Sequence, residues 1–426
     1  MPRFFAKTVL LPDGWANDVC ITIDENGWIT DIQTNSTHQN ATQLNGPVIP
    51  GMPNLHSHAF QYAFAGQSEF ATAEQDSFWT WRKLMYQFLE TRGAEELENI
   101  ATQLYSKMLQ KGYTHVGEFH YIHHQPDGTP YDDPAHLAHA MIRAAKKVGI
   151  GITMLPVLYA YSGFGSQAPE GGQKRFIHTT DSYLNVIGAL STEYKDDPLV
   201  RIGVAFHSLR AVSPEMITDV CQAVQELDKN MPIHIHIAEQ EKEVEDCITW
   251  SGKRPVEWLF KNNDIGANWC LVHATHMTGN ETTALANSGA VAGICPTTEA
   301  NLGDGFFNLP QYIRDGGTWG IGSDSHISMD ALEELRLLEY GQRLLLKQRA
   351  IARTEDMPHV GDYLYHTALK GGAQAMGAKI GELSVGRRAD FIVLSNNDVA
   401  SDIRLDTLVF TDSLQIAQTY TAGILR

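Results

Sequence analysis

Short apolar runs alternate with amphipathic segments through the middle of the chain. The runs are typical of strands buried on both faces of a sheet, and they lie at Val48–Pro53, Thr114–Tyr121, Gly151–Tyr159, Val200–Ser208, Ile233–Ala238, Trp269–Ala274, Ala290–Cys295 and Thr318–Ser323. Segments with helical periodicity separate them, such as Ala94–Lys111, Pro134–Val148, Pro214–Asp228 and Glu281–Asn287. Strands that are each followed by a helix or a long connection predict parallel pairing and a (β/α)8 TIM barrel over residues 48–379.

The two ends of the chain show a different pattern. Residues 1–47 contain "DVCITIDENGWITDIQ", in which two alternating runs flank the turn residues "ENG". Residues 380–426 begin with "IGELSVGRRADFIVLS", which again indicates short strands separated by turns. Neither end has enough apolar residues for a core of its own. We therefore predict one small β-sandwich-like domain assembled from both termini.

Composition and charge narrow the classes of function. The chain has 426 residues, 43% of them hydrophobic and 19% charged, as in soluble globular proteins. A formal net charge of -18 argues against nucleic acid or a membrane surface as a partner. The five cysteines are scattered without CxxC spacing, and neither a signal peptide nor a membrane-spanning run is recognisable. These features predict a cytoplasmic protein.

Four residues at the ends of predicted strands form a candidate metal site. His56 and His58 follow the first run in "PVIPGMPNLHSH", His236 lies towards the end of the fifth, and Asp324 follows the eighth. Two histidines one residue apart on a strand point to the same face. Barrel active sites lie at the carboxyl ends of the strands, so the four side chains are expected to converge. Three imidazoles and a carboxylate suit one divalent metal ion, with zinc as the default.

Hydrolysis at such a site needs a base for the proton of water and an acid for the leaving group. Asp324 is expected to bind the metal through one oxygen and to accept a proton on the other. Glu239 lies three residues after His236 at a predicted strand-to-helix turn, where its carboxylate can face the substrate. His273 ends the sixth run and points to the same rim, as a further metal ligand or as an electrophilic group. We predict Glu239, His273 and Asp324 as the catalytic residues.

Together these motifs resemble the amidohydrolase superfamily, in its mononuclear deaminase branch. The resemblance rests on HxH after the first run, HxxE after the fifth, the histidine of "CLVHAT" and the "SDS" after the eighth, with "CPTTEANLGDG" and "GELSVGRRADFIVL" as further signatures. It covers essentially the whole chain. It implies a hydrolytic deaminase and a homodimer. It also favours a single metal ion. Binuclear relatives have a lysine at the end of the fourth strand that bridges two metals, whereas the fourth run here has His207 and no lysine.

Finer motifs resemble a member of this branch that acts on a small anionic amino-acid derivative carrying an amidine. They are "LHSHAFQYAFAG", "FWTWRKLMY", "GYTHVGEFHYIHH" and "AFHSLRAVSP". A dicarboxylate needs bidentate partners, so Arg82 and Arg210, with His207, are predicted to bind carboxylates. Tyr121 and Gln61 are predicted to complete the substrate site. The other aromatic residues of segment 59–93 are interpreted as packing.

Three other functions stay open at this point. A deaminase of the same branch could act on guanine, an adenosine derivative or a triazine, although a neutral heterocycle does not need two arginines. Hydrolysis of an amide or an ester on the same metal is a second alternative. The third is a non-catalytic member retained for binding or assembly, against which the intact metal and acid–base positions argue.

Overall fold

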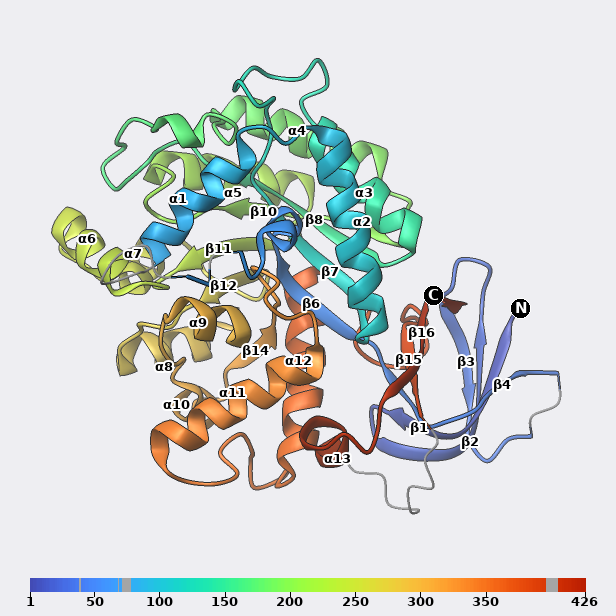
Figure 1. Ribbon diagram of the computed structural model, residues 1–426. Helices are drawn as coiled ribbons and strands as arrows, with labels where there is room; N and C mark the ends of the chain where they lie inside the picture. The colour runs from blue at the N-terminus through green and yellow to red at the C-terminus, as the bar shows by residue number, and fades with distance from the viewer. Residues whose placement is uncertain (38–39, 68, 71–77, 396–404) are drawn as a thin grey trace.

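The computed structural model describes residues 1–37, 40–67, 69–70, 78–395 and 405–426. It consists of a parallel barrel and a smaller sheet beside it, and both chain ends lie on that smaller sheet (Figure 1). Within these ranges, no helix combines the length and the apolar character that crossing a membrane requires.

The barrel strands follow one another in chain order around the ring. They are β6 (Met52–Ser57), β7 (Tyr113–His120), β8 (Gly151–Leu158), β10 (Val204–Phe206), β11 (Ile233–Ile237), β12 (Trp269–His273), β13 (Val291–Ile294) and β14 (Thr318–Ile321). A further short strand, β9 (Val200–Ile202), pairs with β8. Between the first and last strands the pairing is reduced to one parallel bridge from Ser57 to Asp324. The predicted (β/α)8 barrel is confirmed.

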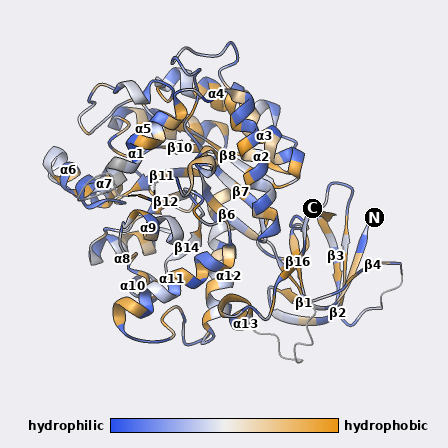
Figure 2. Ribbon diagram, in the orientation of Figure 1, coloured by the Kyte–Doolittle hydropathy of each residue, from blue (hydrophilic) through white to orange (hydrophobic). Residues whose placement is uncertain are grey.

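Most of the helices cover the outside of the barrel (Figure 1), whereas α1 (Phe78–Leu89) and the 3-10 turn η1 (Ala59–Phe64) reach a pocket at its carboxyl end. The other helices are α2 (Ala94–Gln110), α3 (His136–Val148), α4 (Thr180–Glu193), α5 (Pro214–Leu227), α6 (Glu241–Ser251), α7 (Pro255–Asn262), α8 (Gly279–Ser288), α9 (Pro296–Leu302), α10 (Leu309–Arg314), α11 (Ala331–Leu346), α12 (Val360–Met376) and α13 (Leu405–Phe410), with the 3-10 turn η2 (Gly171–Gln173). Both α2 and α11 mix hydrophobic and hydrophilic residues along their length (Figure 2). In α2 the apolar residues Leu97, Leu104 and Met108 are buried at helical spacing, as in an amphipathic helix that packs on a barrel.

Two predicted strands are broken at glycines. The run Val48–Pro53 divides at Gly51 into β5 (Val48–Pro50), which joins the smaller sheet, and barrel strand β6. A Cβ atom on Gly51 would lie 2.2 Å from the Cγ2 atom of Thr114, so only glycine allows this close approach. The run Val200–Ser208 similarly divides at Gly203 into β9 and β10.

The smaller sheet combines strands from both ends of the chain. Its strands are β1 (Arg3–Leu11), β2 (Gly14–Ile23), β3 (Ile29–Gln33), β4 (Thr42–Leu44), β5, β15 (Phe391–Leu394), β16 (Ile416–Thr421) and β17 (Ile424–Leu425), in one mixed sheet. Phe4 and Ile21 from the first end and Phe391 and Tyr420 from the other belong to one buried cluster. The predicted small β-domain built from both termini is therefore confirmed.

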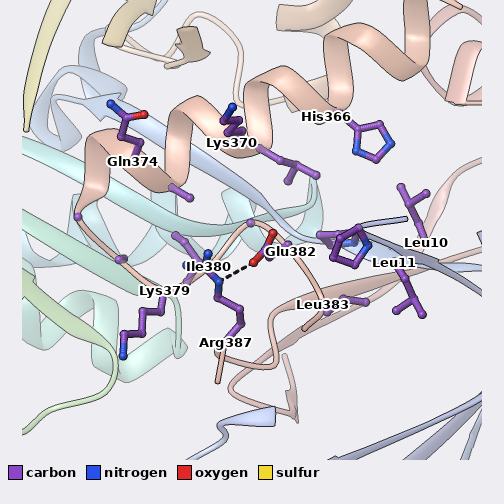
Figure 3. Close-up of a pocket in the computed structure, with 17 residues that line it drawn as sticks. Leu10, Leu11, His366, Lys370, Gln374, Lys379, Ile380, Glu382, Leu383 and Arg387 are labelled. Carbon is purple, nitrogen blue, oxygen red and sulfur yellow. Dashed lines mark hydrogen bonds and ion pairs between the residues drawn. The ribbon is translucent and has the colours of Figure 1, made fainter. Parts of the chain in front are cut away.

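A cleft of about 570 Å³ lies between α12 and the smaller sheet (Figure 3). Leu10, Lys370 and Glu382 line it, and Glu382 forms an ion pair of 2.7 Å with Arg387. Pro50, also in its wall, precedes strand β6, so the cleft lies at the amino-terminal end of the barrel strands. None of its lining residues is a predicted site residue.

Candidate active site

The predicted site residues meet at the carboxyl end of the barrel. One pocket is lined by His58, Gln61, Arg82, Tyr121, His207, Arg210, His236, Glu239, His273 and Asp324. His56 lies directly beneath, fully buried between His58 and His236. Most of these side chains end barrel strands or directly follow them, as the strand-end pattern predicted. Arg82 reaches the pocket from α1 and Gln61 from η1.

Three imidazole nitrogens converge on one point. The Nε2 atom of His56 lies 3.2 Å from that of His58 and 2.9 Å from that of His236. The Oδ1 atom of Asp324 lies 3.3 Å from the His58 nitrogen and 3.6 Å from the His56 nitrogen. Burial lowers the pKa of His58 to about 3, so its ring is neutral. Neutral nitrogen lone pairs this close together, beside a carboxylate, fit a divalent cation.

The backbone holds these ligands in place. His58 donates its Nδ1 hydrogen to the carbonyl oxygen of Phe119 at 2.8 Å, which leaves Nε2 as the free acceptor. The Asp324 N–H donates to the carbonyl of His56 at 3.0 Å, and the His58 N–H donates to the carbonyl of Asp324 at 3.2 Å. The hydrogen bonds that close the barrel are thus also the ones that place the ligands. Asp324 and His273 both have positive φ values, of 46° and 68°, which side-chain-bearing residues seldom adopt.

His273 lies among three carboxylates. Its Nε2 atom is 3.7 Å from Glu239 Oε1 and 3.7 Å from Asp324 Oδ2, and its Nδ1 atom is 3.2 Å from Glu299 Oε1. Burial opposes a charged imidazole, but Glu239, Glu299 and Asp324 outweigh it and raise the pKa of His273 to about 10. Burial, with a smaller contribution from Glu239 and Glu299, raises the pKa of Asp324 to about 7. The cluster is therefore built to hold and transfer a proton near neutral pH.

The opposite wall of the pocket is positively charged. Within the described ranges, Arg82 and Arg210 have no ion pair with a carboxylate, and the buried Arg82 Nη1 and Arg210 Nε atoms lack a hydrogen-bond partner. Burial and the neighbouring Arg210 keep the pKa of His207 well below its usual value, so this ring is neutral. Gln61 donates from Nε2 to the hydroxyl oxygen of Tyr121 at 3.0 Å. Two guanidinium groups that have no carboxylate partner among the described residues suit an anionic ligand.

Comparisons with known proteins agree with this geometry. The model of the Amidohydrolase family matches residues 48–425. The chain belongs to the amidohydrolase family. A second model, for the N-terminal domain of formimidoylglutamate deiminase HutF, matches residues 1–45. The family resemblance predicted from the motifs is therefore confirmed.

Individual relatives cover nearly the whole chain. A formimidoylglutamate deiminase from Pseudomonas aeruginosa is 51% identical over 402 residues, which cover 93% of this chain and 87% of that protein. A 5-methylthioadenosine/S-adenosylhomocysteine deaminase from Syntrophobacter fumaroxidans is 26% identical, with 82% and 72% covered. The crystal structure of an amidohydrolase from Brucella melitensis is 43% identical, with a TM-score of 0.94 over 100% of this chain and 94% of that one. An adenosine deaminase from Xanthomonas campestris with bound zinc shares the fold, at 21% identity and a TM-score of 0.81 over 99% and 92%.

The sequence analysis missed several residues of this amidohydrolase site. Glu299, in the first turn of α9, contacts His273. It lies within "CPTTEANLGDG", and an acidic residue shortly after a strand end was the sequence feature that could have identified it. Trp81 and Tyr86 of α1 also line the pocket. The interpretation of the α1 aromatic residues as packing was therefore incomplete, because one face of the helix forms a wall of the site.

Proposed function

We propose that the chain is a formimidoylglutamate deiminase, which hydrolyses N-formimidoyl-L-glutamate to N-formyl-L-glutamate and ammonia in histidine catabolism. The reaction breaks a C–N bond of an amidine, as expected of an amidohydrolase. The observation that supports the proposal most strongly is that one pocket holds two arginines, Arg82 and Arg210, with no ion pair among the described residues, together with the cluster of His273, Glu239 and Asp324. The 51% identity to a formimidoylglutamate deiminase supports the same substrate.

The ligands that would hold the metal are His56, His58, His236 and Asp324. We propose zinc, because the three imidazole nitrogens lie together and Asp324 Oδ1 is within 3.6 Å of two of them, which matches the nitrogen and oxygen donors of catalytic zinc sites. When bound, such an ion lowers the pKa of a water molecule and polarises the amidine. The chain's own residues must supply substrate orientation and proton transfer.

The arginine wall orients the substrate. Arg82, Arg210 and the neutral His207 bind the two carboxylates of the glutamate portion. Gln61 and Tyr121, joined by their 3.0 Å hydrogen bond, complete this half of the pocket. With the carboxylates held there, the formimidoyl carbon faces Asp324 and Glu239. Orientation of this kind converts binding energy into rate.

Three side chains move the protons. Asp324 accepts the proton of the attacking water on Oδ2, the oxygen that faces His273. Glu239 and His273 deliver a proton to the terminal nitrogen of the amidine, so that this nitrogen leaves as ammonia. The glutamate nitrogen stays bonded to the formyl carbon, because the acid reaches only the terminal nitrogen. One water is consumed for each ammonia released.

Replacement of the arginines tests the substrate class. In the Arg82→Met and Arg210→Met variants, kcat/KM for N-formimidoyl-L-glutamate should fall by about 10- to 100-fold each, because a charge-assisted hydrogen bond is lost. Arg92→Met is the matched control, since Arg92 lies just beyond the carboxyl end of α1 and contacts Phe88 at 4.6 Å. A protein that acts on a neutral heterocycle would deaminate guanine or adenosine equally well in all variants, and that result would remove the dicarboxylate assignment.

We further propose a homodimer that works in the cytoplasm. All five cysteines are free, in agreement with a reducing compartment. The side chains of Leu344, Leu345 and Tyr340 on α11 are 79%, 53% and 39% exposed, and an apolar row of this kind is typical of an interface. Light scattering should give twice the 47.3 kDa chain mass, and Leu344→Glu should lower it. A monomeric mass for the unaltered chain would contradict the dimer.

A further inference from the structure

Trp79, in the first turn of α1, contacts both arginines of the pocket. The guanidinium carbon of Arg82 lies 4.6 Å from the centroid of the Trp79 ring, and that of Arg210 lies 5.6 Å from it. Both distances are within the range of a cation–π interaction. Arg82 and Trp79 are three residues apart on one helix, whereas Arg210 follows strand β10. A single indole therefore joins the two halves of the arginine wall.

The contact with Trp79 reduces the repulsion between two like charges in the pocket. Arg82 and Arg210 carry like charges into one buried space, and within the described part of the chain no carboxylate forms an ion pair with either. The face of an indole ring carries a negative quadrupole, which attracts a cation without adding a net charge. Trp79 thus offsets the repulsion between the guanidinium groups and leaves their hydrogen-bond donors for a ligand.

The helix that carries Trp79 is itself held on the barrel. Arg175 donates from Nη1 to the carbonyl oxygen of Leu89, the last residue of α1, at 2.6 Å, and from Nε to the carbonyl oxygen of His124 at 3.0 Å. Tyr86, one turn before the end of α1, is in ring contact with Phe176, at 5.8 Å between centroids. The carboxyl-terminal half of α1, the helix that carries Trp79, is therefore anchored to the barrel.

We propose that Trp79 is a positioning residue that sets the spacing of Arg82 and Arg210 so that both carboxylates of one ligand bind at once. The inference rests on the proposed function for the identity of the substrate, and it adds the residue that governs selectivity for two carboxylates over one. Trp79 lies on the arginine side of the pocket. Its loss should therefore act on carboxylate binding and spare proton transfer at Glu239 and His273.

The test compares Trp79→Leu with Trp79→Phe on two substrates. N-formimidoyl-L-glutamate carries two carboxylates and N-formimidoylglycine carries one. For Trp79→Leu, KM for the glutamate compound should rise about tenfold with kcat nearly unchanged, as expected for loss of a desolvated cation–π contact. The preference over the glycine compound should shrink by the same factor. Trp79→Phe keeps an aromatic face and should restore most of the preference.

A matched control lies on the same helix. Phe88→Leu removes an equal contact, since the ring of Phe88 lies 4.6 Å from the guanidinium carbon of Arg92, a residue that does not line the pocket. This variant should leave the substrate preference unchanged. A loss of preference as large in Phe88→Leu as in Trp79→Leu would overturn the proposal, because the effect would then be a general property of α1.

Binding of glutarate, measured by calorimetry on the zinc-loaded protein, distinguishes the positioning role of Trp79 from the proposed deiminase activity. Glutarate needs the arginine pair but no turnover. Weaker binding of glutarate to Trp79→Leu than to the unaltered chain supports the positioning role. Failure of the unaltered chain to release ammonia from amidines would count against the proposed function only. Equal binding of glutarate to both proteins would overturn the positioning role, whatever the activity.

Discussion

The Nδ1 atom of His273 lies 3.2 Å from the Oε1 atom of Glu299, at the start of helix α9. The same carboxylate oxygen accepts the N–H of Cys295 at 2.9 Å, which fixes the carboxylate against the end of strand β13. Glu299 therefore orients the His273 ring so that its Nε2 atom lies 3.7 Å from Glu239 Oε1 and from Asp324 Oδ2. A carboxylate behind a functional histidine commonly has this orienting role.

The Glu299→Gln variant should lower kcat by about 10- to 100-fold, because an amide holds the His273 ring less firmly. Metal content, measured by elemental analysis, should not change. Glu281→Gln is the control: Glu281 is likewise a buried carboxylate in the first turn of a helix, but it binds Arg254 and Thr278 away from the pocket. Equal turnover in Glu299→Gln and the unaltered protein would exclude the orienting role.

Glu239→Gln should reduce turnover by about 10²- to 10⁴-fold, the usual contribution of a positioned acid or base. The carboxylate of Glu239 is within 3.7 Å of His273 Nε2, and an amide there cannot pass on a proton. Metal content should stay at the level of the unaltered protein. Near-normal turnover with full metal occupancy would remove Glu239 from the proton pathway.

Removal of the metal should abolish ammonia release and lower the melting temperature. The Nε2 atoms of His56 and His236 are 2.9 Å apart, and an ion shared by such ligands stabilises the folded chain in proportion to its affinity. Dialysis against a chelator, followed by calorimetry and by zinc addition, measures both effects. His58→Ala should bind less than one equivalent of zinc. Full activity after verified metal removal would contradict the assignment of these histidines.

A histidine cluster outside the pocket predicts acid sensitivity. Burial lowers the pKa values of His120 and His178 to about 4 and that of His123 further, with His124 and Arg175 as the neighbouring charged or titratable groups. The unfolded chain then binds more protons than the folded one below pH 6.5, so stability is full above that pH and falls toward pH 4. Between its folded and unfolded pKa values, each histidine changes the free energy of unfolding by about 1.4 kcal/mol per pH unit. Denaturant unfolding from pH 7 to 4 should show a shallower slope for His178→Gln, and an unchanged slope would contradict the prediction.

The sequence was most informative where function depends on strand ends. In a parallel barrel every strand delivers the residue at its carboxyl end to one rim, so His56, His236 and Asp324 could be placed together without knowledge of the packing. The break at Gly51 was not predictable in this way. It depends on the close approach of Thr114 from a neighbouring strand, which an apolar run does not reveal.

Residues on helices were harder to assign. Glu299 and Trp79 act through the way α9 and α1 dock on the barrel, and local periodicity shows only that these segments are helical. Arg82 was placed at the substrate through family resemblance. In the structure Arg82 lines the pocket, and its guanidinium contacts the Trp79 ring, as does that of Arg210.

The proposed deiminase activity is tested by the fate of N-formimidoyl-L-glutamate labelled with a nitrogen isotope at its terminal nitrogen. The zinc-loaded protein is incubated with this compound, and the products are followed by NMR, with N-formimidoyl-L-aspartate and guanine alongside. We expect labelled ammonia and unlabelled N-formyl-L-glutamate in equal amounts, with rapid turnover of the glutamate compound alone. Formation of L-glutamate and labelled formamide, or deamination of guanine with the amidine untouched, would contradict it.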